Sequence, residues 1–292
     1  MMDAVLAFST GFIWAVGIIL NRKSLSNSNF FSSIMVITLV GNIIIWPMLL
    51  FLNPKTTFNV YGFILFVLAG LFQPGLARLL YFKGMLKAGV APNASIFATY
   101  PLFSTLLAIF LLNEQPTFFL WIGIVLVVAG AIMIQNSMHN KDAIKSAKSG
   151  LLISAGASIV AGLGFVFKKV GLNAYNEPLV GVGIAYLTSM ILYTFMFAIS
   201  PRIRSQTSVD SKALKLFWKT GLCLVMGHMF AFYAMQFGNV SVVAPLLQTE
   251  PLFVLLLTQL YLKDYEQLSR RLAFGTLLIV LGIAIITVFR SL

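Results

Sequence analysis

Residues 99–103 read Thr-Tyr-Pro-Leu-Phe, and residues 249–253 read Thr-Glu-Pro-Leu-Phe, 150 positions later. The likeness extends outward on both sides. Before each stretch stands a small residue followed by methionine, Gly84-Met85 in one case and Ala234-Met235 in the other. After each stretch comes an acidic residue, Glu114 or Asp264. Two glycines seven positions apart then follow, Gly123 and Gly130 or Gly275 and Gly282. Because the match includes polar and proline positions, it indicates an internal repeat rather than a chance likeness of apolar segments.

The composition around these stretches is that of a membrane protein. Of 292 residues, 59% are hydrophobic and 10% are charged, against about 25% charged residues in soluble domains. A helix that crosses the bilayer needs about 20 apolar residues. The sequence therefore predicts an all-α polytopic membrane protein with ten transmembrane helices, at 4–21, 30–52, 60–86, 92–112, 117–135, 150–170, 178–200, 214–236, 240–262 and 272–289.

The repeat divides the chain into a first five-helix half (1–136), a polar linker (137–149) and a second five-helix half (150–292). Five is an odd number, so the halves enter the membrane in opposite orientations. The loops agree, because the loop after the third span carries Lys83 and Lys87 whereas its counterpart after the eighth span carries no basic residue. Inverted repeats are typical of secondary transporters.

The net charge of +12 comes from 20 basic and 8 acidic residues. Most of the basic residues fall in loops on one side: Arg22, Lys23, Lys83, Lys87, Lys141, Lys145, Lys148, Arg202, Arg204, Lys212, Lys215, Lys219, Lys263, Arg270 and Arg271. We assign only Lys55, Lys168, Lys169 and Arg290 to the other side. The positive-inside rule then places both termini outside, and lipid explains the charge without a nucleic-acid partner.

With its proline-centred fourth helix, Glu114 and the glycine pair of the fifth helix, the sequence resembles the drug/metabolite transporter superfamily, and within it the EamA-type transporters. The resemblance implies a central cavity lined by helices 1, 3, 4, 6, 8 and 9, with helices 5 and 10 at the periphery. It also implies transport without ATP hydrolysis, often by proton antiport or exchange. Family members usually have both termini in the cytoplasm, so the charges and the family disagree on orientation.

Ionisable residues inside a membrane are costly and usually functional, and three within the predicted spans stand out as candidates: Arg78, His228 and Glu250. Glu250 is the first candidate, to exchange protons or to bind a substrate ammonium; alternatively, it forms a structural ion pair with Arg78. Arg78 suits a carboxylate or a phosphate, or extends toward the loop. His228 is a proton relay or a satisfied hydrogen-bonding group.

Further candidates are polar or aromatic residues suited to an organic ligand: Trp14, Gln73, Tyr81, Thr99, Tyr100, Gln248 and Thr249. Pro101 and Pro251 interrupt helices at matching points and are predicted hinges near a midplane site. The glycine pairs indicate close packing, within one chain or between two chains of a homodimer. No metal cluster, cofactor motif or nucleophile–base pair is present in the sequence, so we expect no cofactor and no enzymatic activity.

These features predict a multi-pass protein of the cell (inner or plasma) membrane that works by alternating access. The leading hypothesis is an exporter of amino acids or related zwitterions, coupled to protons or exchange, because Arg78 and Glu250 offer opposite charges to one ligand. An importer or exchanger of a nucleotide-like metabolite is an alternative. A membrane scaffold or lipid-handling protein is another.

Overall fold

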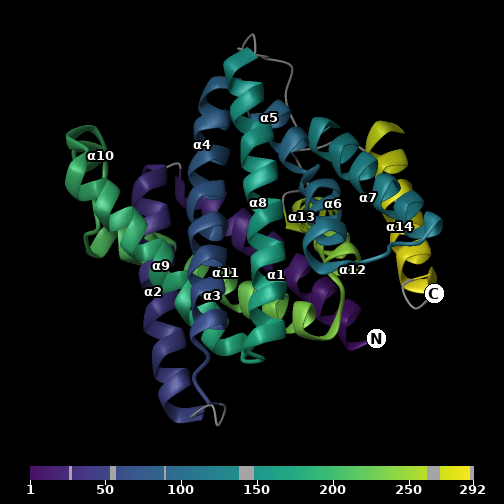
Figure 1. Cartoon of the computed structure of the whole chain (residues 1–292). Helices are drawn as coiled ribbons and strands as arrows, with labels where there is room; N and C mark the ends of the chain where they lie inside the picture. The colour runs from purple at the N-terminus through teal and green to yellow at the C-terminus, as the bar shows by residue number, and fades with distance from the viewer. Residues whose placement is uncertain (26–27, 53–56, 89, 138–147, 262–269, 290–292) are drawn as a thin grey trace.

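The computed structural model describes residues 1–25, 28–52, 57–88, 90–137, 148–261 and 270–289 (Figure 1). These residues form helices and short connections, with no strand among them. Eight of the helical segments are long and apolar enough to cross a membrane, and two further apolar segments, Phe118–Ile134 and Ala273–Phe289, are shorter. The ten segments fall on the ten predicted spans, which confirms an all-α membrane fold.

The first half contains straight helices and two interrupted spans. Its elements are α1 (Met2–Leu25), α2 (Phe30–Leu52), α3 (Val60–Gly70), η1 (Leu71–Leu76), α4 (Ala77–Ala88), α5 (Val90–Phe97), α6 (Tyr100–Leu112) and α7 (Phe118–Ser137). The third span, α3–η1–α4, bends at Gln73, whose φ of −146° and ψ of 119° are not helical. The sequence predicted one continuous helix there.

The second half contains α8 (Lys148–Ala174), α9 (Pro178–Ile199), α10 (Pro201–Gln206), α11 (Ser211–Phe237), α12 (Val240–Leu247), α13 (Glu250–Tyr261) and α14 (Arg270–Phe289). The short helix α10 was not predicted from hydropathy, because its polar residues lie outside the membrane-spanning segments. Helix α8 extends four residues beyond the predicted end of the sixth span. That extension places Lys168 well inside a helix.

The fourth and ninth spans are broken at matching positions. Helix α5 ends before Ala98 and α6 begins at Tyr100, while α12 ends before Gln248 and α13 begins at Glu250. The two breaks are 150 positions apart, as the repeat predicts. Pro101 and Pro251 do not kink a continuous helix; each lies in the first turn of a new helix, where proline is well tolerated.

The helices of the two halves interlock. Helix α1 packs along α11, and its counterpart α8 packs along α3 and α4. Helix α1 also contacts α12 and α13, and α8 contacts α5 and α6. The first helix of each half is thus packed against the third and fourth spans of the other half. This arrangement gathers the broken spans around α1 and α8 at the centre of the molecule (Figure 1).

Helices α7 and α14 pack together at one edge of the molecule (Figure 1). Their glycines face one another: a Cβ atom added to Gly123 would lie 3.0 Å from the carbonyl oxygen of Gly282, and one added to Gly282 would lie 2.7 Å from that of Gly123. Gly130 and Gly275 approach each other in the same way. The glycine seam therefore serves packing within the chain.

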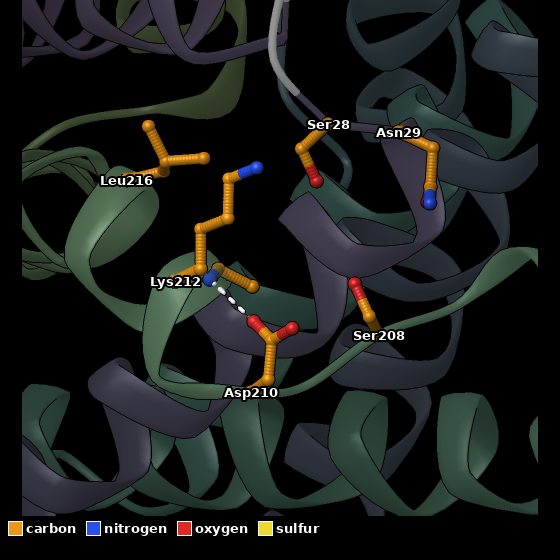
Figure 2. Close-up of a pocket in the computed structure, with 7 residues that line it drawn as sticks. Ser28, Asn29, Ser208, Asp210, Lys212 and Leu216 are labelled. Atoms are coloured by element: carbon orange, nitrogen blue, oxygen red, sulfur yellow. Dashed lines mark hydrogen bonds between the residues drawn. The ribbon is translucent and has the colours of Figure 1, made fainter.

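A polar pocket lies at one end of the bundle, where the connection between α1 and α2 meets the start of α11 (Figure 2). Its lining comprises Ser28, Asn29, Ser208, Asp210, Lys212, Ala213 and Leu216. Asp210 is the N-cap of α11, since its Oδ1 atom accepts a hydrogen bond of 2.7 Å from the backbone N–H of Ala213. None of the residues singled out at mid-span lines this pocket.

Candidate functional site

Arg78 lies in the first turn of α4, directly after the bend of the third span. Its Nη1 atom is buried and has no hydrogen-bond partner. Lys168 and His228 lie within electrostatic range of it. We call Arg78 and Lys168 the cationic group, with His228 beside it. A partly buried guanidinium with a buried, unused donor is suited to receive a carboxylate or phosphate oxygen.

Lys168 is the residue that sequence reasoning missed. We assigned it to the side of the membrane that carries few basic residues, but its side chain lies in α8 and is fully buried. Its Nζ atom donates a hydrogen bond of 2.8 Å to Oε1 of Gln73 and lies 4.5 Å from the ring centroid of Phe165. Lys168 lies six residues before the end of α8. A lysine at such a position can extend to the membrane interface or turn into the protein, and hydropathy is the same in both cases. The packing of the helices is therefore needed to tell the two apart.

His228 is held by three helices. Its Nδ1 atom is 2.7 Å from the carbonyl oxygen of Leu224 on α11 and 3.2 Å from the hydroxyl of Tyr186 on α9. The ring of Trp14 on α1 lies 5.0 Å away, centroid to centroid. The structure therefore brings together His228 and Trp14, which were both predicted, and adds Tyr186, a fully buried residue that the sequence analysis did not select.

Glu250 is the first residue of α13 and lies at mid-span. The partial positive charge of a helix N-terminus favours a carboxylate there. Tyr81 and Tyr100 are close enough to interact with its charge. These two tyrosines were predicted candidates, and both lie within electrostatic range of Glu250. The three residues form what we call the acidic group.

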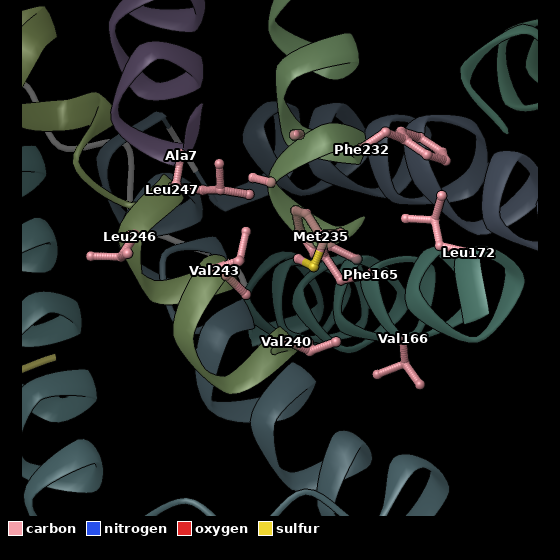
Figure 3. Packing of buried hydrophobic residues seen from close by; sticks show 14 of the residues in the cluster. Ala7, Phe165, Val166, Leu172, Phe232, Met235, Val240, Val243, Leu246 and Leu247 are labelled. Atoms are coloured by element: carbon pink, nitrogen blue, oxygen red, sulfur yellow. The ribbon is translucent and has the colours of Figure 1, made fainter. Parts of the chain in front are cut away.

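An aromatic wall connects the two groups. The ring of Tyr100 stacks on Phe165, with centroids 5.1 Å apart, and Phe165 in turn lies under the Nζ atom of Lys168. Phe232 of α11 lies 5.3 Å from the same Nζ atom. Figure 3 shows Phe165 and Phe232 within the apolar cluster formed by α8, α11 and α12. A ligand between the groups would meet charge at its ends and rings along its side.

No ion pair joins Arg78 to Glu250 in this conformation. In the described part of the chain, an ion pair is instead formed by the N-terminal ammonium and Asp3. The structural pair that we considered as an alternative is therefore not formed here. Both charges remain available, one in each group, because neither is neutralised by the other.

Three predicted candidates lie at the helix breaks. Thr99 bonds through Oγ1 to the carbonyl oxygen of Ile96 and to Ser158, at 2.6 and 3.0 Å. Gln248 donates a 2.8 Å hydrogen bond to the carbonyl oxygen of Ala98. Thr249 is fully buried, and its Oγ1 atom has no hydrogen-bond partner. Thr99 and Gln248 thus hydrogen-bond to backbone carbonyl groups at the break of the fourth span.

Glu114 joins the halves at one end of the site. Its Oε1 and Oε2 atoms accept hydrogen bonds from the backbone N–H groups of Val240 and Ser241, at 2.8 and 2.9 Å. These are the first N–H groups of α12, which have no partner within the helix. The carboxylate thus caps the ninth span from the end of the fourth. Its repeat counterpart, Asp264, lies outside the described residues.

The interlocked helices and the matching broken spans give this chain the architecture of a membrane transport protein. The sequence matches the EamA-like transporter family over residues 1–135 and 148–288, and the chain belongs to that family. It is a multi-pass integral membrane protein whose relatives in the family are transporters.

Two individual proteins are similar to this chain. An uncharacterized transporter of Archaeoglobus fulgidus is 28% identical over 138 residues, which are 46% of this chain and 47% of that protein. The match thus spans about half the length of the curated relative. A protein of known crystal structure is 18% identical and covers 98% of both chains with a TM-score of 0.77. At that identity the likeness shows the fold alone.

Proposed function

We propose that this protein is a secondary transporter that exports small zwitterionic metabolites, amino acids or their relatives, by alternating access. The observation that carries the proposal is the separation of Arg78 and Glu250: two opposite charges lie at mid-span with no ion pair between them. A zwitterion placed between them would present its carboxylate to Arg78 and its ammonium to Glu250. Buried charges require such partners.

The arrangement of the helices supports the transport mechanism. Spans that are broken at matching positions of two repeats are typical of midplane binding sites, around which one repeat rocks against the other. Here the breaks are 150 positions apart, and the sequence repeat indicates that the halves are inverted. We propose Pro101 and Pro251, beside the breaks, as hinges.

Glu250 is the proposed coupling group. A carboxylate that accepts a proton when the ligand ammonium leaves could carry that proton back across the membrane, which would give proton antiport. This role requires that Glu250 be reached from either side in turn. Its place at the break of the ninth span, next to the proposed hinge Pro251, supports that requirement.

Transport by purified protein in liposomes tests the proposal. Preloaded labelled amino acids should leave wild-type vesicles faster when a pH gradient is imposed, and Glu250→Gln should abolish the response to the gradient. Arg78→Ala should abolish binding of the amino acid. The matched controls are Glu177→Gln, in the turn before α9, and Lys83→Gln, on the exposed face of α4. Both controls should behave as wild type.

The rival functions predict other results. A scaffold or lipid-handling protein would show no flux of any solute or proton across a broad panel, and Glu250→Gln would change nothing. An exchanger of nucleotide-like metabolites would show flux of nucleotides and not of amino acids. Either result would overturn the proposal.

A further inference from the structure

The cationic group contains two positive charges, whereas a simple zwitterion has one anionic group to pair with them. Arg78 can receive the carboxylate of an amino acid and Glu250 its ammonium, but Lys168 is left over. Lys168 is fully buried, and its one hydrogen bond goes to Gln73, a neutral amide. An ammonium group has three donors, and no ion pair to Lys168 occurs among the described residues.

The neighbours of Lys168 contact its ammonium group inside the protein. The bend of the third span presents Gln73 to α8, and the approach is possible because Gly164 has no side chain: a Cβ atom there would lie 3.1 Å from the backbone nitrogen of Gln73. Phe165 and Phe232 flank the ammonium with their ring faces at 4.5 and 5.3 Å. Rings attract a cation but do not neutralise it.

The other buried carboxylates are engaged elsewhere. Glu114 caps α12 through two backbone N–H groups, and Asp3 pairs with the N-terminal ammonium. Among the described residues, Arg78 and Lys168 therefore have Glu250 as the one carboxylate of the site. Two positive charges and one negative charge are complementary to a ligand with two anionic groups and one cationic group.

We infer that the substrate is a zwitterion with an additional oxyanion group, and that Lys168 is the residue that selects for that group. The inference rests on the proposed function and narrows its substrate class. A second carboxylate, as in acidic amino acids, and a phosphate ester, as in phosphorylated amino acids, share this chemistry. The oxyanion would lie against Lys168 beside the ring of Phe165, while Arg78 and Glu250 bind the amino-acid end.

Binding to the purified full-length protein in detergent tests the inference. The probes are glutamate and O-phosphoserine, which carry the additional oxyanion. Their neutral counterparts are glutamine, which matches glutamate in shape, and serine, which lacks the phosphoryl group. We expect the acidic probes to bind about 10- to 100-fold more tightly than their neutral counterparts, the range for one charge-assisted hydrogen bond. The two pairs distinguish a carboxylate from a phosphate substrate.

Variants at position 168 test the role of the residue. Lys168→Gln should abolish the preference for the acidic probe while binding of the neutral one changes less than about threefold, and Lys168→Arg should retain the preference. Lys169→Gln is the matched control, because the neighbouring ammonium donates to the carbonyl oxygen of Met235, away from Gln73. Thermal unfolding checks that each variant is folded.

Each outcome has a distinct meaning. Equal binding of glutamate and glutamine, and of O-phosphoserine and serine, would overturn the inference and leave the proposed function standing. That comparison uses the wild-type protein, so it holds even if the variants do not fold. An acidic preference that survives Lys168→Gln would overturn the role of Lys168. Failure to bind any amino acid would contradict the proposed function itself.

Discussion

The side chain of Gln248 donates a 2.8 Å hydrogen bond to the backbone carbonyl oxygen of Ala98, the residue that occupies the equivalent position in the other half, 150 places earlier. Each residue lies at the break of its own span. The bond therefore joins the two breaks directly, and it satisfies a carbonyl group that the end of α5 leaves without a helical partner.

Replacement of Gln248 by alanine should weaken the contact between the two helix breaks. The carbonyl of Ala98 would lose its partner in a buried setting, which costs about 1–3 kcal/mol. We expect a lower thermal unfolding midpoint in detergent, with Gln236→Ala, which removes an exposed hydrogen bond to Asn176, as the control. An unchanged midpoint for Gln248→Ala would show that the bond does not brace the halves.

Replacement of Glu114 by alanine should loosen the start of α12. The N–H groups of Val240 and Ser241 would lose a charged acceptor, and caps of this kind contribute about 0.5–2 kcal/mol. Amide hydrogen exchange should become faster at these two positions. Exchange in α9 should stay as in wild type. Equal rates in α12 before and after the substitution would contradict the capping role.

The glycine seam between α7 and α14 should not tolerate a methyl group. A Cβ atom on Gly130 would lie 2.5 Å from the carbonyl oxygen of Gly275 and 2.7 Å from the side chain of Ile279. Gly130→Ala should therefore destabilise the protein by about 1–3 kcal/mol through overpacking. Gly156→Ala in α8 is the control, since a Cβ atom there meets nothing within 4 Å. The prediction fails if both variants unfold at one temperature.

Gly11 and Thr249 should be energetically coupled. A Cβ atom on Gly11 would collide with Oγ1 of Thr249, an atom that has no hydrogen-bond partner to lose. Gly11→Ala should lower the unfolding midpoint, Thr249→Ala should have little effect, and the double variant should recover most of the loss. A double-mutant cycle measures the coupling. Additive effects would show that the two residues do not meet.

The buried position of Lys168 strengthens the prediction of how the chain is oriented in the membrane. Because this lysine is buried, the side of the membrane with few basic residues has one fewer than the sequence suggested. The positive-inside rule then favours the connection between α9 and α11 as cytoplasmic. In a Cys223→Ala background, Ser208→Cys should resist an impermeant maleimide in intact cells, whereas Asn176→Cys should react. The opposite labelling would place both termini in the cytoplasm.

The sequence predicted the ten spans because their apolar length is set by the bilayer, and the position of the helix breaks because Pro101 and Pro251 occupy matching places in the repeat. Hydropathy could not predict that Lys168 turns inward, since that depends on the bend at Gln73 and on the absence of a side chain at Gly164. It also could not assign Gln248 to the backbone of Ala98, because the freed carbonyl exists only once the helix is broken. Contacts between spans, rather than properties of single spans, decided these cases.

The hydrogen bond between Lys168 and Gln73 also bears on how the chain is assembled in the bilayer. A lysine placed in a membrane helix disfavours insertion by about 2.5–3.5 kcal/mol at mid-helix. Gln73 precedes Lys168 by 95 residues, so during synthesis the amide is already in the membrane when α8 emerges from the ribosome. Phe232, which completes the surroundings of the ammonium, follows later with α11. The order of translation thus supplies the polar partner of Lys168 first and its second aromatic neighbour last.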